Sequence, residues 1–132
     1  MSLAASMLDD DALRVADDGF ELDVHLNWYR SLPLSSLKTV ELAVNGDPIP
    51  RDEITFVFDG NEYALDDLAE RWEEMWFVLD PATLRVRRAD PVQAGEEAEV
   101  SIRLGNRIPY ILIGPDQALE YVTERTKTLV AR

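Results

Sequence analysis

Strict alternation of apolar and polar side chains is the feature that most constrains how this chain of 132 residues can fold. Residues 20–28 read FELDVHLNW, in which every second side chain, from Phe20 to Trp28, is apolar and those between are polar. Successive side chains of a strand point to opposite faces, so this pattern predicts a strand with one buried face. The same period recurs in five later segments: 38–44, 54–58, 82–88, 97–113 and 125–131.

Residue pairs that favour tight turns separate some of the predicted strands. Asn45-Gly46 follows the strand over 38–44, and Asp59-Gly60 follows the strand over 54–58. Both pairs suit the positive φ angles of two-residue hairpin turns. A short return strand is therefore expected after each turn.

One segment has a different period. In residues 65–75 (LDDLAERWEEM) and the tryptophan that follows, apolar side chains recur at helical spacing, with carboxylates on the opposite side. The apolar face consists of Leu65, Leu68, Ala69, Trp72 and either Met75 or Trp76. We predict a short α-helix here, with Trp72 and the nearby Phe77 in the core.

These patterns indicate a mainly β chain, because many short strands are separated by turns and no alternation of strands with helices is visible. We expect an antiparallel β-sandwich or partly open barrel with one short α-helix packed at an edge or end. The length fits a single domain over residues 1–132. Within it, residues 1–12 are expected to form a flexible or loosely packed N-terminal arm.

Charge and composition exclude several classes of partner. The formal net charge is −13, so the chain repels phosphate backbones and anionic lipids, and we expect no nucleic-acid and no membrane partner. No apolar run approaches the roughly 20 residues that a membrane-spanning helix needs. The chain has no cysteine and carries an acidic run at residues 9–11, which suits a reducing compartment and argues against a targeting leader. We therefore predict a cytoplasmic protein.

Few residues have the chemistry of a catalytic or metal site. His25 is the single histidine and lies on the polar side of its predicted strand. It could act as a general base or as one metal ligand, but a catalytic zinc site typically needs three protein ligands, so a surface histidine is favoured. Asp59 begins a stretch like a calcium loop, but Leu65 stands where an oxygen ligand is needed. We predict no catalytic residue and no metal site in this chain.

The stretch LNWYRSLPLSSL, residues 26–37, places aromatic and apolar side chains in the connection after the first long strand. Aromatic residues with a polar tip are favoured at interfaces, because they bring a large contact area at low entropic cost. Trp28 and Tyr29 therefore indicate a binding surface. The proline in residues 107–111 lies inside an apolar strand, which indicates an edge or bulge position and gives a second candidate surface.

Four motifs within residues 27–71 resemble those of one protein family. They are YRSLPLS at 29–35, VNG at 44–46, PRDEITF at 50–56 and YALDDL at 63–68. The segment is similar to the small β subunit of bacterial C-glycoside deglycosidases, also called C-deglycosylation enzymes. The likeness extends more loosely to ATLRVRR, to the EVSIRL strand and to the terminal TKTL, whereas position 31 is Ser where the family pattern has Gly.

The resemblance implies that two subunits divide the work. In that family a larger α subunit, similar to sugar-phosphate isomerases with a TIM barrel, holds a divalent metal and the acid/base residues; manganese is the metal expected. It acts as a carbon–carbon lyase on the bond between a 3-oxo-sugar and an aromatic aglycone such as a flavone. The resemblance makes this chain the β-sandwich-like companion in a hetero-oligomer, with no cofactor of its own.

We expect the α subunit to cover two segments that are exposed when this chain is alone. The Leu-Pro-Leu step supplies an apolar anchor, and Arg30 is available for a bidentate contact with a carboxylate. The predicted interface residues are Trp28, Tyr29, Arg30, Leu32, Pro33, Leu34, Arg107, Ile108, Pro109 and Tyr110.

Two other functions stay open at this point. An independent carbohydrate-binding module would use exposed Trp28, Tyr29 or Trp76 as flat platforms for sugar rings. A small enzyme in its own right would use His25 with nearby carboxylates.

Overall fold

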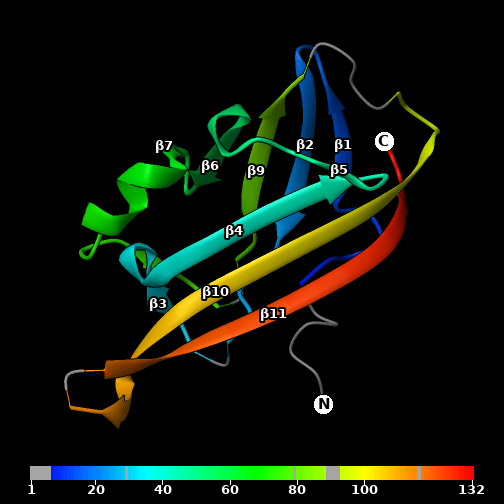
Figure 1. Cartoon of the computed structure of the whole chain (residues 1–132). Coiled ribbons are helices and arrows are strands. Elements are labelled where there is room, and N and C mark those ends of the chain that lie inside the picture. The colour runs from blue at the N-terminus through cyan, green and yellow to red at the C-terminus, as the bar shows by residue number, and fades with distance from the viewer. Residues whose placement is uncertain (1–6, 29, 79, 89–92, 116) are drawn as a thin grey trace.

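The computed structural model describes residues 7–28, 30–78, 80–88, 93–115 and 117–132, which form mostly antiparallel strands (Figure 1). Five strands form one sheet in the order β1-β2-β9-β6-β7, four form a second in the order β11-β10-β4-β5, and β3 and β8 form a two-stranded ribbon. Figure 1 shows the four-stranded sheet lying in front of the five-stranded one. The described strands do not close into a barrel, and the predicted mainly β, sandwich-like fold is confirmed.

The five-stranded sheet supplies one wall of the core. Its strands are β1 (Leu13–Ala16), β2 (Gly19–Val24), β6 (Ile54–Phe58), β7 (Asn61–Ala64) and β9 (Ala82–Arg87). Leu84 pairs with Leu22 on one side and with Phe56 on the other, and all three side chains are buried. The strand predicted over 20–28 ends at Val24. In the connection that follows, the consecutive residues Leu26 and Asn27 are both buried, so burial no longer alternates as it does in a strand.

Two tight turns form where the sequence predicts them. Asn45 and Asp59 both have a φ of 53°, and the glycines that follow have φ values of 80° and 79°. Left-handed backbone at both central positions is the geometry of a two-residue hairpin turn. The first turn leads into β5 (Asp47–Pro48), which pairs with β4, and the second leads into β7.

The four-stranded sheet contains the longest strands. β4 (Leu37–Val44) pairs with β10 (Glu97–Gly114), and β10 pairs along nearly its whole length with β11 (Gln117–Val130). The last strand was predicted over 125–131 but begins at Gln117. The alternation that predicts strands is missing from its first half, where half-buried positions include polar Thr123 and where apolar Val122 is exposed.

The predicted α-helix is a 3-10 helix, η4 (Leu65–Glu70). Its three residues per turn place Leu65 and Leu68 on one buried side, and Ala69 is exposed. Trp76 reaches the core from β8 (Met75–Trp76), which pairs with β3 (Leu32–Pro33). Two further 3-10 turns are η2 (Leu34–Ser36) and η3 (Arg51–Glu53). The described residues contain no helix whose length and apolar character would allow it to span a bilayer.

Two aromatic predictions are wrong. Trp72 is 69% exposed and Phe77 is 52% exposed, although both were expected in the core. The helix ends at Glu70, so Trp72 no longer follows the face of Leu65 and Leu68. Phe77 follows directly after buried Trp76 in the chain, and neighbouring side chains of an extended segment point to opposite sides.

The N-terminal segment is packed from Met7 onward, in contrast to the loose arm predicted over 1–12; residues 1–6 lie outside the described residues. Met7 and Leu8 are buried, and the Met7 carbonyl accepts a hydrogen bond of 2.9 Å from the His25 amide. Lys127 Nζ on β11 donates to the Leu8 carbonyl at 3.3 Å and lies 2.6 Å from Asp10 Oδ1. The segment thus covers a part of β11 that carries polar side chains.

Charged side chains on the outer face of the five-stranded sheet pair with each other. Arg14 donates to both carboxylate oxygens of Asp23, at 2.5 and 2.9 Å. Thr83 Oγ1 donates to the same carboxylate at 2.8 Å, and Arg85 Nε lies 3.1 Å from Glu21 Oε2. This face therefore already satisfies its charged groups in water and offers few unpaired ones to a partner.

The Asp23 pairing generates a prediction about acid stability. Burial raises the pKa of Asp23, but hydrogen bonds from Arg14 and Thr83 and the positive charge of Arg14 outweigh it, so the pKa lies below the ordinary value of 3.8. Such a group stabilises the fold above its ordinary pKa, and this contribution is lost as the pH falls through the folded-state value. Asp23→Asn cannot titrate, so it should lose less stability than the natural chain as the pH falls below the ordinary Asp value of 3.8, as measured by thermal unfolding.

Arg14→Met is the matched control, because it leaves the carboxyl group and removes its main donor. It should also flatten the acid limb of the stability curve. An unchanged acid limb in the Asp23→Asn protein would contradict a lowered pKa at this position.

Candidate partner-binding surface

The connection between β2 and β4, residues 25–36, runs partly through the interior. Leu26 and Asn27 are buried, Trp28 is half-buried and Arg30 is exposed; Tyr29 lies outside the described residues. Three of its residues, Leu26, Leu32 and Leu34, belong to the hydrophobic core. Only part of this connection is therefore available to a partner.

A buried hydrogen-bond network fixes the connection to the four-stranded sheet. Asn27 Nδ2 donates to the Leu104 carbonyl at 3.1 Å and to Thr123 Oγ1 at 2.9 Å. Asn106 Nδ2 donates to Asn27 Oδ1, and Ser36 Oγ donates to Asn106 Oδ1 at 3.3 Å. Both asparagines are fully buried, and buried amides are stable only when their polar atoms have partners. The network therefore holds the connection, β10 and β11 in one arrangement.

The expectation that the Leu-Pro-Leu step is exposed is wrong for its two leucines. Leu32 is 1% exposed and Leu34 is 0% exposed. The backbone explains this burial: Leu32 pairs with Trp76, and the Leu34 amide then donates to the Glu74 carbonyl at 2.8 Å as the chain enters η2. Pro33, between them, is half-buried. The leucines are core residues. From the sequence alone, a leucine that binds a partner cannot be distinguished from one that packs in the core of its own chain.

The hairpin of β10 and β11 extends past the rest of its sheet (Figure 1). The last β10 residue paired with β4 is Asn106, whereas pairing with β11 continues from Arg107 to Gly114. Register shifts between Ile108 and Gly114 indicate β-bulges in this part, which we call the hairpin tip and define as residues 107–120. Bulges are common where a strand re-aims side chains at a functional site.

Large apolar side chains on the hairpin tip are exposed. Tyr110 is 54%, Leu112 is 64% and Ile113 is 66% exposed. Arg107 is also exposed, as predicted, but Ile108 is fully buried, which corrects the expectation for that residue. Nothing is described of the side chain of Pro109. The tip residues that sequence reasoning missed are Leu112 and Ile113.

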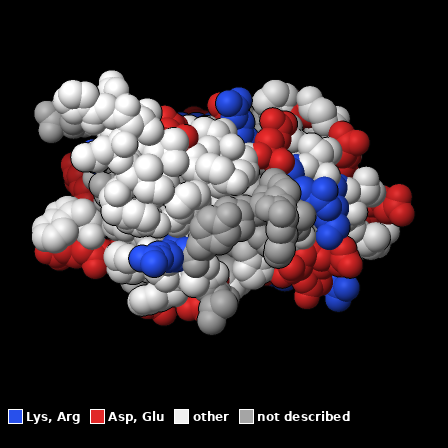
Figure 2. Space-filling view, turned by 90° about the horizontal axis from the view of Figure 1, so that it is seen from below, with Lys and Arg blue, Asp and Glu red and all other residues white. Residues whose placement is uncertain are grey.

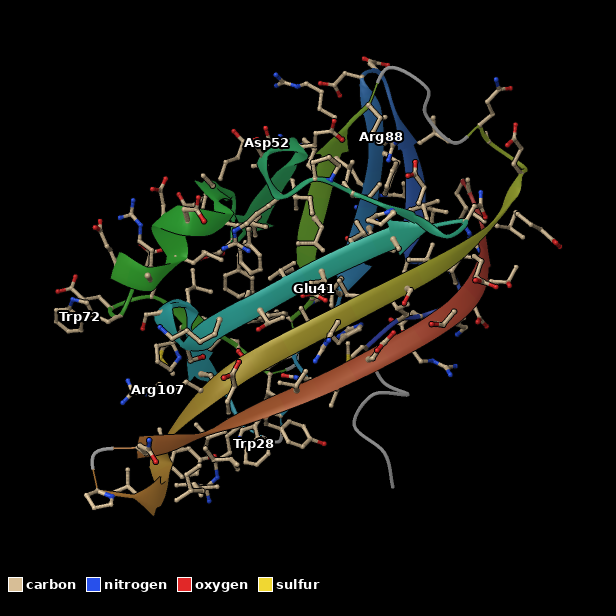
Figure 3. The ribbon with its side chains drawn as sticks, viewed as in Figure 1. Trp28, Glu41, Asp52, Trp72, Arg88 and Arg107 are labelled. Atoms are coloured by element: carbon tan, nitrogen blue, oxygen red, sulfur yellow. The ribbon has the colours of Figure 1, made fainter. Side chains whose placement is uncertain are left out.

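Trp28 joins the connection to the hairpin tip. Its indole N–H donates to the Tyr110 hydroxyl, and its ring packs edge-on against Tyr121 of β11 with 5.0 Å between the ring centroids. The two segments that the sequence marked as candidate surfaces therefore meet in space through Trp28 and Tyr110. Figure 3 shows Trp28 beside the base of the tip.

A second group of exposed apolar side chains lies after η4. We call Trp72, Met75 and Phe77 the Trp72 patch; Met75 is 37% exposed. Figure 3 shows Trp72 and Arg107 at the same end of the molecule as the hairpin tip. Figure 2 shows a broad area of uncharged side chains on the left of the face seen from below, with most charged side chains at its margin or to its right. Contiguous exposed apolar side chains are a feature of protein interaction sites, which makes this end of the molecule the candidate surface.

His25 has a structural contact. Its Nε2 atom lies 2.7 Å from Asp9 Oδ2, which ties the N-terminal segment to the end of β2. Among the described residues, no group of three or more His, Asp or Glu side chains is placed to hold a metal ion.

A shallow cavity of about 550 Å³ lies on the outer face of the four-stranded sheet. Its lining mixes charges of both signs, including Lys38, Glu41, Arg103 and Glu124, and Arg103 lies 3.7 Å from Glu41. Figure 3 shows Glu41 on β4. Apolar residues, among them Val40, Leu42 and Ile49, share this lining, so the cavity is of mixed character rather than purely polar.

Comparisons with known proteins place the chain among subunits of one enzyme type. A family profile described as C-glycoside deglycosidase beta subunit matches residues 5–110. C-glycoside deglycosidase beta subunits from Arthrobacter globiformis and Microbacterium trichothecenolyticum are 36% and 31% identical over 125 residues, covering 95% of this chain and 92% and 94% of the relatives. A 3'-dehydrocarminate deglycosidase beta subunit from a Microbacterium species is 34% identical over 101 residues, covering 76% of this chain and 75% of the relative.

The burial of Leu34 generates a prediction about folding. Leu34→Asp removes a fully buried leucine and places a carboxylate in the core, so the isolated chain should lose at least about 3 kcal/mol of unfolding free energy. The same change at exposed Leu112 is the matched control and should shift stability by only about 0.5 kcal/mol. Urea unfolding of both variants measures the difference. Normal stability of Leu34→Asp would contradict its burial and return the Leu-Pro-Leu step to the surface.

Proposed function

This chain belongs to the C-glycoside deglycosidase beta subunit family, and we propose on that premise that it is the accessory subunit of a heteromeric carbon–carbon lyase. The larger α subunit, with a TIM barrel similar to sugar-phosphate isomerases, holds the divalent metal, manganese, and the acid/base residues. The complex works in the cytoplasm. The observation that carries this proposal is the family match over most of the chain, together with the exposed apolar end of an otherwise highly charged molecule.

The proposed reaction breaks the carbon–carbon bond between a 3-oxo-sugar and an aromatic aglycone such as a flavone. A carbonyl group beside the reacting carbons makes a neighbouring proton easier to remove, so the reaction needs a metal or hydrogen-bond donor at that oxygen and a base. We assign these groups to the α subunit. The name of one relative, the 3'-dehydrocarminate deglycosidase beta subunit, supports the proposal that the sugar is oxidised, because the substrate in that name is a 3'-dehydro compound.

In this proposal the present chain contributes a folded surface that completes the complex. Its hairpin tip and Trp72 patch are apolar, whereas the outer face of the five-stranded sheet pairs its own charges. Burial of apolar surface stabilises association without the cost of stripping water from charges. The α subunit is therefore expected at the end of the molecule that carries the tip.

The alternative of an independent carbohydrate-binding module has less support. A sugar platform must be a flat, exposed ring, but Trp76 is 1% exposed and Trp28 is half-buried between Tyr110 and Tyr121. Tyr29, the third ring proposed for that role, lies outside the described residues.

Reconstitution tests the proposed function. The purified chain alone should show no turnover of a 3-oxo-C-glucosyl flavone and no tight binding of Mn²⁺. An equimolar mixture with the TIM-barrel protein encoded beside it should release the aglycone, which chromatography detects. Turnover by the isolated chain would overturn the accessory role, and an inactive, non-associating mixture would overturn the heteromeric complex.

His25→Ala in the reconstituted complex separates the accessory subunit from a small enzyme. A histidine that only ties Asp9 to β2 can be removed with less than about a tenfold loss of rate, or roughly 1.4 kcal/mol in the barrier. A larger loss in a complex that still assembles would place His25 in the chemistry.

A further inference from the structure

The hairpin tip projects beyond the other strands of its sheet (Figure 1). Past Asn106 it is a two-stranded ribbon, since β10 there pairs with β11 and no longer with β4. A two-stranded ribbon has no sheet face behind it to bury its side chains, so apolar residues on it stay in water unless another surface covers them. Leu112 and Ile113 are accordingly about two-thirds exposed, at 64% and 66%.

The composition of the tip differs from that of the rest of the chain. Residues 108–119 contain one charged residue, Asp116, in a chain with 30% charged residues and a net charge of −13. Protruding segments in such a chain would be expected to carry charge, which keeps exposed edges soluble. A protrusion whose charged residues lie mainly at its base, as Arg107 and Glu120 do, can enter a dry cavity at a lower desolvation cost than a charged one.

The base of the tip is fixed in place before any partner binds. Thr39 Oγ1 donates to Glu120 Oε1 at 3.3 Å, which links β4 to β11 across Gly105 of the strand between them. A Cβ atom at Gly105 would lie 2.9 Å from Thr39 Cβ, so the close approach there requires glycine. Trp28 holds the other side of the base through Tyr110 and Tyr121. A fixed base lowers the entropic cost of inserting the tip.

We propose that the hairpin tip inserts into an apolar concavity of the α subunit and is the main anchor of the complex, with Leu112 and Ile113 as its contact residues. The inference rests on the proposed heteromeric function and adds which part of this chain binds and what kind of surface receives it. The partner surface is concave and lined by apolar or aromatic side chains, because the tip is a narrow projection that has one charged residue between Arg107 and Glu120.

A second copy of this chain is a poorer receptor. The cavity described on the outer face of the four-stranded sheet mixes apolar residues with Lys38, Glu41, Arg103 and Glu124, and the tip would have to strip these four charged groups of water to fill it. Two copies also repel each other, because each carries a net charge of −13.

Leu112→Asp tests the inference, with Val130→Asp as matched control. Val130 is 47% exposed on the same hairpin, near the opposite end of β11, so both variants add one charge at an exposed apolar site. The dissociation constant for the α subunit should rise at least about 30-fold for Leu112→Asp, as for loss of a hot-spot residue, and less than about threefold for Val130→Asp. Both melting temperatures should stay near that of the natural chain. Ile113→Asp repeats the test at the neighbouring position.

The outcomes separate this inference from the proposed function. If the natural chain binds the α subunit and the Leu112 and Ile113 variants bind equally well, the anchor is elsewhere and the inference fails while the heteromeric function stands. If the natural chain does not bind the α subunit, both fail. If the isolated chain forms a dimer that Leu112→Asp dissociates, the tip binds a second copy and the inference is overturned.

Discussion

The hydrogen-bond network of two buried asparagines, Asn27 and Asn106, is the interaction on which the arrangement of the functional end depends. It connects three parts of the chain: the connection after β2, the middle of β10 and, through Thr123, the inner side of β11. An unsatisfied buried amide costs about 1–3 kcal/mol, so alternative placements of these segments that break the network are disfavoured. The network lies where β10 separates from β4, and it therefore sets where the hairpin tip begins to project.

The surface of the molecule has two regions of different physical character, the outer face of the five-stranded sheet and the end that carries the hairpin tip. The outer face of the five-stranded sheet carries cross-strand ion pairs, such as the part-buried pair of Arg14 with Asp23, which give many of its charged groups a partner within the chain. The opposite character appears at the end of the sandwich, where the hairpin tip and the Trp72 patch present aromatic and aliphatic side chains. A chain of net charge −13 thus has a charged surface over most of the molecule and exposed apolar side chains at one end.

The sequence predicted the strands with one apolar face and the turns with special backbone angles, because both depend on local patterns. The alternation around Phe20 and the Asn45-Gly46 turn are both found in the structure. Features that depend on tertiary packing were missed. The helical period over residues 65–75 predicted an α-helix, but within this segment only Leu65 and Leu68 are buried, and they lie in a short 3-10 helix.

For the candidate surface, the sequence predicted the exposed Arg30, Arg107 and Tyr110, but it misassigned Leu32, Leu34 and Ile108 and missed Leu112 and Ile113. Leu34 and Leu112 each belong to an apolar stretch, and nothing local distinguishes the one that enters the core from the one that stays in water. The difference arises from long-range pairing, since Leu32, two residues before Leu34, meets Trp76, whereas Leu112 lies beyond the reach of β4. One feature of the sequence could have identified the exposed tip: residues 108–119 contain a single charged residue in a highly charged chain.

Amide hydrogen exchange of this chain, with and without the α subunit, tests most directly whether the projecting tip is the bound end. Exchange resolves which backbone segments become protected, and it reports on the natural sequence without any substitution. The account predicts slower exchange in residues 107–120 on binding, with β2 and β9 unchanged because their outer face stays in water. Protection of β2 and β9 with an unchanged tip would contradict it.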